Sequence, residues 1–303
     1  MRAAVLQEIG HTPVVTDFDE PDIESSVAVC LAGCNPVDLA LAAGKMGDQA
    51  VPKVVGKEGV GFTSDGDRVY FDSPPSPFGS WAQRTSVDPK KVYPVPDGVD
   101  DDLAVAMGIA GLAAWLPLTR HADVVGKSVL ILGATGVVGN IAVQAAKLLY
   151  AASVVAAGRD ADALEATLDL GADAVVRLDD DTPFALRKEA GDGYDVVLDL
   201  VYGDPFLAAL DATAPGATLI TVGQGAGASA DVPFMKLVGR THVGHLNDMM
   251  PADAVRTAYG ELAAHAAEGR IRVETTRYSL DDAQRAWQAQ ADGPHVKIAI
   301  DPT

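Results

Sequence analysis

The chain of 303 residues has little positive charge, few cysteines and no long hydrophobic run. Its 23 lysine and arginine residues are outnumbered by 42 aspartate and glutamate residues, which gives a formal net charge of −19. This charge disfavours binding to a nucleic-acid backbone or an anionic membrane, so neither partner is expected. No apolar stretch approaches the roughly 20 residues that a membrane-spanning helix needs. The start, MRAAV, also lacks the hydrophobic region of a signal peptide, and we expect a cytoplasmic protein.

The two cysteines, Cys30 and Cys34, fit a redox pair, half of a metal site or two buried free thiols. Their three-residue separation differs from the two-residue spacing of a redox motif, and no second pair exists to complete a structural zinc site. Alternation around Cys30 puts Val27, Val29 and Leu31 on one face of a strand and Cys30 on the other. Buried free thiols are therefore the favoured interpretation.

The clearest positive feature is an apolar run that leads into a glycine-rich turn, VLILGATGVVG over residues 129–139. Four apolar residues without polar alternation are typical of a parallel strand that is buried on both faces. Gly136 lets the backbone approach a phosphate, and Gly139 lets the following helix, expected over 140–149, pack against the strand. The N-terminus of that helix would face the phosphate charge.

The spacing is Ala-x-Gly-x-x-Gly, in which Ala134 stands where the usual fingerprint has its first glycine. Alone, this pattern also fits a glycine turn that holds no ligand; its context favours a dinucleotide site. We expect the pyrophosphate to lie against Ala134, Thr135, Gly136, Val137, Val138 and Gly139.

A second apolar run ends about twenty residues later in Gly158-Arg159-Asp160. In a Rossmann unit, the residue at this strand end meets the adenine ribose, where an acidic side chain binds the 2′-hydroxyl of NAD. Gly158 would instead leave room for a 2′-phosphate, to which Arg159 can make charge-assisted contacts. The pair predicts NADPH rather than NADH. The alternative is that Arg159 caps a surface loop and pairs with Asp160.

Turn and breaker signals organise the rest of the chain. Residues 1–110 carry short β-like runs broken by Asp-Gly, Pro-Pro and Phe-Gly turns, which indicates a partly β domain. From about 114 to 246, buried strands alternate with helices, as in an α/β fold with a doubly wound parallel sheet. The expected strands are 129–132, 154–157, 175–176, 196–199 and 219–222, with a helix through Leu164 and Leu170 that ends at Gly171. A helix over 251–268, a helix capped by Ser279 and a strand over 296–300 follow.

Six short motifs occur in a fixed order along the chain. They are AGCNPVDL at 32–39, GKEGVG at 56–61, GDRV at 66–69, AGLAAW at 110–115, the glycine turn at 133–139 and the tail at 293–300. Together they resemble the medium-chain dehydrogenase/reductase superfamily, and within it the zinc-free quinone oxidoreductase group. The resemblance implies a GroES-like catalytic domain at 1–113, a Rossmann NADP-binding domain at 114–246 and a return segment at 247–303 that completes the catalytic domain. It also implies a homodimer.

The resemblance allows a test for catalytic zinc. Zinc-dependent relatives carry cysteine, histidine and cysteine at the positions that match Asn35, Lys57 and Ile109. An amide, an ammonium and an alkyl group cannot together supply three suitable zinc ligands, so no metal is expected. The remaining chemistry is hydride transfer from NADPH to a small-molecule acceptor, a quinone or an α,β-unsaturated carbonyl.

The charge that develops on the acceptor's carbonyl oxygen needs a hydrogen-bond donor and a proton source. Asn35 is the first candidate for the donor. Lys57 is the second, as an ammonium that stabilises the charge or gives a proton; the alternative is that Lys57 is only an exposed or ion-paired neighbour of Glu58. Solvent is an equal source of the proton. Gly223 and Gln224 are expected beside the nicotinamide half of the cofactor, with the role of the Gln224 side chain open.

The chain departs from the family pattern at Ala113 and Ala40, where relatives commonly carry threonine and tyrosine. These losses keep a non-catalytic NADPH-binding redox sensor among the alternatives. A second alternative is an enoyl-thioester reductase, which the negative charge and the lack of a lysine and arginine cluster disfavour. Phe78 and Trp81 follow a proline-rich loop and form either an apolar wall for a flat acceptor or an anchor for the loop.

Overall fold

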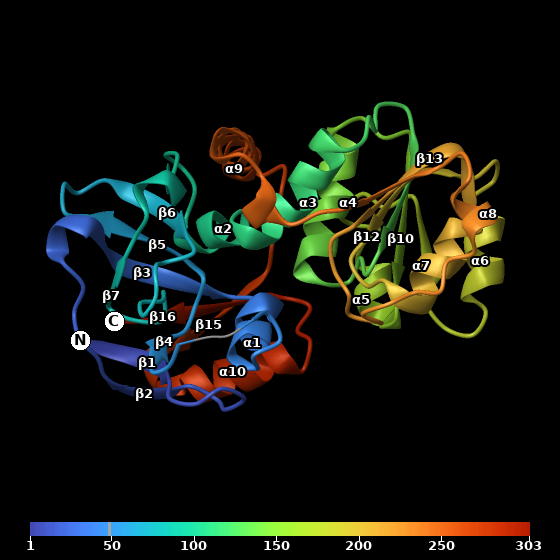
Figure 1. Cartoon of the computed structure of the whole chain (residues 1–303). Coiled ribbons are helices and arrows are strands. Elements are labelled where there is room, and N and C mark those ends of the chain that lie inside the picture. The colour runs from blue at the N-terminus through green and yellow to red at the C-terminus, as the bar shows by residue number, and fades with distance from the viewer. Residues whose placement is uncertain (48–49) are drawn as a thin grey trace. The chain divides into compact units, whose positions relative to one another are not determined.

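A computed structural model describes residues 1–47 and 50–303 (Figure 1). They form two compact units, one of residues 1–110 with 252–303 and the other of residues 111–251. The predicted divisions lay after residues 113 and 246. Among the described residues, no helix has the length and apolar character needed to cross a membrane.

The first unit contains β1 (Arg2–Leu6), β2 (Val14–Asp17), η1 (Ile23–Ser25), β3 (Ser26–Cys34), α1 (Pro36–Ala42), β4 (Lys53–Val54), β5 (Glu58–Thr63), β6 (Arg68–Asp72), β7 (Arg84–Ser86), η2 (Pro89–Lys91), β8 (Val92–Pro94), α2 (Asp101–Ala106), α9 (Ala252–Ala267), β15 (Thr275–Ser279), η4 (Leu280–Asp282), α10 (Ala283–Ala291) and β16 (Lys297–Asp301). The second unit contains β9 (Ser128–Leu132), α4 (Val137–Leu148), β10 (Ser153–Gly158), α5 (Ala161–Glu165), β11 (Ala174–Arg177), α6 (Thr182–Glu189), β12 (Tyr194–Asp199), α7 (Gly203–Leu210), β13 (Thr213–Thr221), α8 (Phe234–Leu237), β14 (Thr241–Gly244) and η3 (Asn247–Met249). Helix α3 (Ile109–Arg120) starts in the sequence of the first unit and continues in that of the second.

The second unit is built on a six-stranded sheet in the order β11-β10-β9-β12-β13-β14, and every neighbouring pair is parallel. In chain order this is 3-2-1-4-5-6, the arrangement of a Rossmann fold. Four of the five residues of β9 are buried, as its unbroken apolar run predicts. Helices α3 and α4 lie on one side of the sheet and α6 and α7 on the other (Figure 1). The predicted doubly wound sheet is confirmed.

The first unit is mostly β. Its larger sheet follows the order β15-β16-β3-β5-β6-β8, with β7 also paired to β3, and β1 lies between β2 and β4 in a three-stranded sheet. Strand β16, near the end of the chain, pairs with β3 so that Ile298 faces Cys34. The return segment therefore completes a sheet that begins more than 260 residues earlier.

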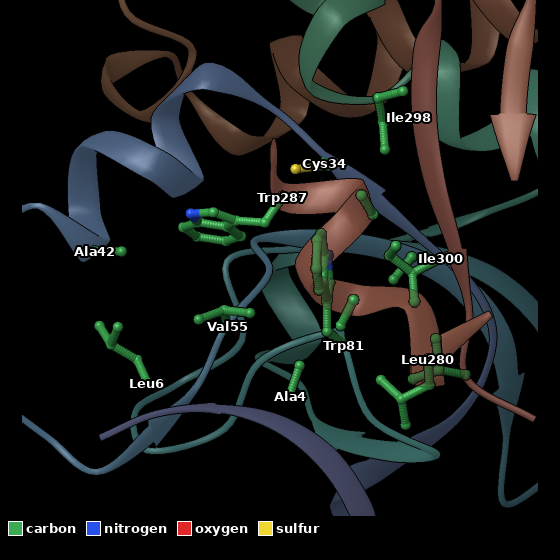
Figure 2. Packing of buried hydrophobic residues seen from close by; sticks show 14 of the residues in the cluster. Ala4, Leu6, Cys34, Ala42, Val55, Trp81, Leu280, Trp287, Ile298 and Ile300 are labelled. Carbon is green, nitrogen blue, oxygen red and sulfur yellow. The ribbon is translucent and has the colours of Figure 1, made fainter. Parts of the chain in front are cut away.

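The core of the first unit lies between α10 and the strands. The rings of Trp81 and Trp287 meet edge to face there, with centroids 5.6 Å apart. Figure 2 shows both rings among the buried side chains of this cluster. Cys34 belongs to the same cluster, and burial raises the pKa of its thiol well above the usual value. Cys30 is half-buried, and both thiols are free, as predicted.

Several element ends differ from the sequence predictions. Helix α4 begins at Val137 rather than Asn140, directly after Gly136 at its N-cap position. The helix expected through Leu164 and Leu170 ends at Glu165, which corrects that prediction. The Thr167 hydroxyl donates to the Leu164 carbonyl oxygen at 2.6 Å. Beyond Glu165 the backbone continues in turns whose hydrogen bonds join each N–H to the carbonyl oxygen three residues earlier. Local side-chain bonding of this kind competes with the helical pattern.

Candidate functional site

The glycine turn of the second unit connects β9 to α4. Gly133 has a φ of +81°, which favours glycine, and Gly136 precedes the first helical residue. A Cβ on Gly139 would overlap the carbonyl oxygen of Gly133 and the Cα of Ala134, whereas one on Gly136 would meet only ordinary contact at 3.8 Å. Gly139 is thus required for packing the helix against the turn. Gly136 lies at the positive end of the helix dipole, where the added Cβ has no second neighbour within 4 Å among the described residues.

Gly158, at the end of β10, packs against this turn. A Cβ on Gly158 would lie 2.6 Å from the methyl carbon of Thr135. The space beside this buried glycine is therefore filled by Thr135, and the structure gives the glycine a packing role that sequence reasoning missed.

Arg159 is exposed, and the Asp160 carboxylate caps α5 by accepting the Ala163 N–H at 2.9 Å. Arg159 lines a cavity of about 390 Å³, together with residues that follow β11, β12 and β13. Among these are Asp179, Pro205 and Gly225. The guanidinium therefore lies at the carboxyl edge of the parallel sheet, where Rossmann folds bind their ligands.

Gly223 lies at the same edge. Leu132, Asp199 and Thr221 stand side by side in register at the ends of β9, β12 and β13. The Gly223 N–H donates to the Asp199 carbonyl oxygen at 3.4 Å, and a Cβ on Gly223 would overlap the carbonyl oxygen of Leu200. The side chain of Gln224 is exposed. The fold thus brings the three predicted cofactor segments, 134–139, 158–159 and 223–224, to one edge of one sheet.

Asn35 lies in a buried polar network of the first unit and is 5% exposed. The Lys297 ammonium donates to Asn35 Oδ1 at 2.8 Å, and Asn35 Nδ2 donates to Glu58 Oε1 at 2.7 Å. Because an ammonium only donates and a carboxylate only accepts, these two partners fix the orientation of the amide. Within residues 1–47 and 50–303, this leaves one Nδ2 hydrogen for a further acceptor.

Glu58 and Lys297 form the centre of this network. They are 0% and 1% exposed, and Lys297 Nζ lies 2.6 Å from Glu58 Oε1. The second carboxylate oxygen accepts the Tyr70 hydroxyl at 2.9 Å and the Ile109 N–H at 2.7 Å. A third Lys297 hydrogen bond goes to the Cys34 carbonyl oxygen at 3.3 Å. Such a pair is stable only when hydrogen bonds satisfy both charges.

Lys57 lines a separate cavity of about 220 Å³ in the first unit, together with Asp38 and Phe78. Its backbone N–H donates to Asp38 Oδ1 at 2.9 Å, and the Asn35 N–H donates to Asp38 Oδ2 at 2.8 Å. Burial raises the pKa of Asp38 to about 6. The Asp38 carboxylate therefore bridges the backbone N–H groups of Asn35 and Lys57, the two predicted catalytic residues.

The two aromatic residues after the proline-rich loop have separate positions. Phe78 is half-buried and lines the cavity beside Lys57. Trp81 is 0% exposed, and its indole N–H donates to the Gly33 carbonyl oxygen at 3.0 Å. Trp81 therefore anchors the proline-rich loop to the β unit, whereas Phe78 forms part of a cavity wall.

The sequence is similar to several known proteins. A family model for zinc-binding dehydrogenases matches residues 170–297. A chloroplastic NADPH-dependent alkenal/one oxidoreductase of Arabidopsis thaliana is 31% identical over 225 residues, which are 66% of this chain and 57% of that protein. Part of a phenolphthiocerol/phthiocerol polyketide synthase of Mycobacterium tuberculosis is 32% identical over 90% of this chain and 13% of that protein.

Solved structures extend the similarity over the whole chain. A probable oxidoreductase from Mycobacterium abscessus has a TM-score of 0.87 at 27% identity, covering 100% of this chain and 99% of its own. A mycobacterial quinone oxidoreductase has a TM-score of 0.88 at 25% identity, with 100% of both chains covered. The chain is a quinone oxidoreductase-like member of the medium-chain dehydrogenase/reductase superfamily.

Zinc does not fit the residues of this quinone oxidoreductase-like protein at the family's catalytic positions. Asn35, Lys57 and Ile109 stand there, and the Asn35 oxygen already accepts from an ammonium. In the described parts of the chain, no group of three histidine, cysteine or acidic side chains is arranged to hold a metal ion.

Sequence reasoning did not find the role of Glu58 and Lys297. Glu58 was within a recognised motif, but only as a neighbour of Lys57. Lys297 is the first residue of β16, and sequence alone places a lysine in an alternating strand on the solvent face, because lysine is rarely buried unless it is paired. Its partner lies 239 residues away in the sequence, which no local pattern indicates.

Proposed function

We propose that the protein is a zinc-independent, NADPH-dependent oxidoreductase that reduces a quinone or an α,β-unsaturated carbonyl. The observation that carries this proposal is the polar network at Asn35, which holds an amide donor where zinc-dependent relatives hold a metal ligand. The Rossmann sheet of the second unit would supply the dinucleotide site, which supports the proposal. This chain spans 57% of the plant NADPH-dependent alkenal/one oxidoreductase, so both the substrate and the cofactor of this chain belong to the proposal.

The residues of the glycine turn would hold the cofactor's pyrophosphate. The N–H groups of Val137 and Val138 lie in the first turn of α4, where helical geometry gives them no partner within the helix. Arg159 would bind the 2′-phosphate, and Gly223 would let the backbone approach the nicotinamide half. When bound, NADPH supplies the hydride.

The first unit would stabilise the charge on the acceptor. The free Nδ2 hydrogen of Asn35 would donate to the carbonyl oxygen as negative charge develops there, in an orientation that Lys297 and Glu58 fix in advance. Lys57 would add a cationic group beside Phe78 on the cavity wall and is the proposed proton source. Loss of one such donor typically reduces kcat by about 10²- to 10³-fold.

A second candidate function is an enoyl-thioester reductase. The similarity of 90% of this chain to part of a polyketide synthase favours it. The two functions differ in the acceptor, because a thioester carbonyl carries a long carrier group and a quinone or enone does not. Turnover of crotonyl thioesters at a higher kcat/KM than any quinone or enone would establish this second function.

We further propose a homodimer in the cytoplasm, paired through β14. This strand is the last of its sheet, and within the described residues only β13 pairs with it. Exposed apolar side chains flank it in both directions: Phe234, Met235 and Val238 before the strand, and Leu246 and Met249 after it. Light scattering of Met235→Lys/Met249→Lys should give half the mass of the wild-type protein. An unchanged mass excludes this surface.

The test of the main proposal combines cofactor binding with turnover. Titration should give tighter binding of NADPH than of NADH, and Arg159→Ala should remove most of that preference. Arg187→Ala is the matched control, because Arg187 is exposed on α6 of the same unit and does not line the cavity. Oxidation of bound NADPH by a panel of quinones and enones then tests the reaction. Tight binding without oxidation by any acceptor would instead favour the sensor alternative.

A further inference from the structure

The Asp199 carboxylate holds the turn that follows β12. Asp199 is 0% exposed, and its Oδ1 accepts the N–H groups of Val201 and Tyr202 at 3.0 and 2.8 Å. Its Oδ2 accepts the hydroxyl of Thr221, the last residue of β13, at 3.0 Å. One buried side chain therefore joins the 200–203 turn to the end of the neighbouring strand.

The backbone of this turn is in a conformation that needs support. Tyr202 has a φ of +58°, in the region that residues other than glycine rarely adopt, and Gly203 follows at +65°. A side-chain-bearing residue stays there only where the surrounding contacts determine it. Asp199 supplies contacts to the backbone, and the Tyr202 ring stacks on the His242 ring with centroids 6.4 Å apart. The Thr221 hydroxyl gives its hydrogen to Asp199, so His242 Nε2 donates to that hydroxyl at 3.0 Å and is held in turn.

The 200–203 turn also borders the proposed cofactor site. Val201 lines the cavity of about 390 Å³ that contains Arg159. A Cβ on Gly133, in the glycine turn, would lie 2.9 Å from the Val201 side chain. On another side, the Ala226 N–H donates to the Val201 carbonyl oxygen at 2.7 Å. The turn therefore contacts the pyrophosphate segment and the segment after β13, and it forms part of the wall of the Arg159 cavity.

We propose that Asp199 is a positioning residue of the cofactor site, whose carboxylate fixes the 200–203 turn before the dinucleotide binds. The inference rests on the proposed function, because the site that this turn borders is the one assigned to NADPH. Asp199 acts through the turn, since it is itself 0% exposed. A site that is already ordered loses less free energy to ordering when its ligand binds. Removal of the carboxylate should therefore weaken NADPH binding without removing a contact to NADPH.

Calorimetric titration with NADPH tests this inference in Asp199→Ala and Asp199→Asn. Alanine removes all three hydrogen bonds of the side chain and should raise the Kd by about tenfold, because the turn would then become ordered only on binding. Asparagine should keep the Kd within about threefold, since its oxygen accepts both N–H groups and its amide donates to Thr221. An alanine variant with the Kd of the wild type, or an asparagine variant as weak as alanine, would overturn the inference.

Asp195→Ala is the matched control for a loss of stability alone. Asp195 lies near the opposite end of β12, where its carboxylate accepts the Ser128 N–H at 3.0 Å. This variant should have a lower melting temperature but a Kd within about twofold of the wild type. If Asp195→Ala weakens binding as much as Asp199→Ala does, Asp199 has no positioning role.

A milder variant decides the inference if Asp199→Ala does not fold. Asp199→Ser keeps a shorter acceptor for the turn and should raise the Kd by at least about threefold, whereas an unchanged Kd would overturn the inference. The titration needs no acceptor, so its result holds even if no quinone or enone is reduced. A wild-type protein that does not bind NADPH would refute the cofactor of the proposed function and this inference together.

Discussion

Replacement of Lys297 by methionine should destabilise the first unit strongly. Methionine keeps most of the length of the side chain but removes three hydrogen bonds, to Cys34 O, Asn35 Oδ1 and Glu58 Oε1. The Glu58 carboxylate then stays 0% exposed with no cation beside it. Breaking a buried ion pair on one side typically costs 3–5 kcal/mol. Three donors, from Asn35, Tyr70 and Ile109, still reach Glu58, so we expect about 3 kcal/mol.

Urea unfolding followed by tryptophan fluorescence measures this loss, because Trp81 and Trp287 both lie in the core of the first unit. The double variant Lys297→Met/Glu58→Gln should be more stable than Lys297→Met alone, since it also removes the stranded charge. Arg285→Met is the control on an exposed pair, with Arg285 2.9 Å from Asp282, and should cost less than about 1 kcal/mol. A loss below about 1 kcal/mol for Lys297→Met would refute the reasoning, because the pair would then be solvated.

Three further predictions concern the two candidate sites. Burial raises the pKa of Asp38 from 3.8 to about 6. Between these two pH values the folded protein keeps a proton on Asp38 that the unfolded chain releases. Wild-type stability relative to Asp38→Asn should therefore be greatest near pH 4 and fall by roughly 2–3 kcal/mol toward pH 7, as measured by denaturation at several pH values. Gly139→Ala should lower the melting temperature of the second unit, whereas Gly136→Ala should leave that temperature unchanged and weaken NADPH binding. Calorimetry measures both quantities. Equal melting temperatures for the two variants would contradict the packing argument. Lys57→Met should lower kcat by about 10²-fold and Lys57→Arg by much less, whereas equal losses in the two variants would exclude a role for the charge.

The second unit could be predicted in detail because its signals are local. A parallel strand that is buried on both faces needs a continuous apolar run, and the turn after β9 needs glycine at fixed positions. Both requirements can be read from the sequence. The length of α5 could not, because the Thr167 hydroxyl competes for the Leu164 carbonyl oxygen. The residue at which the helix ends is then decided by small energy differences between hydrogen-bonding arrangements, which the hydrophobic pattern of the sequence does not show.

The function of Gly158 shows a different limit of sequence reasoning. Its position at the end of β10 was predicted correctly, and its small size was interpreted as space for a 2′-phosphate. The side chain of Thr135 uses that space. A missing Cβ can serve a neighbouring side chain as well as a ligand, and only the three-dimensional contact distinguishes the two. The prediction of a phosphate contact therefore depends on Arg159 alone.

The buried network around Glu58 and Lys297 also explains why an amide side chain suits position 35. An amide can accept from Lys297 and donate to Glu58 with the same side chain, which neither a carboxylate nor an ammonium can do. A cysteine at this position would restore one zinc ligand of the relatives but lose both hydrogen bonds. Recovering a zinc site would thus require replacement of Asn35, Lys57 and Ile109 together, and the first of these changes would leave Lys297 and Glu58 each without one hydrogen bond.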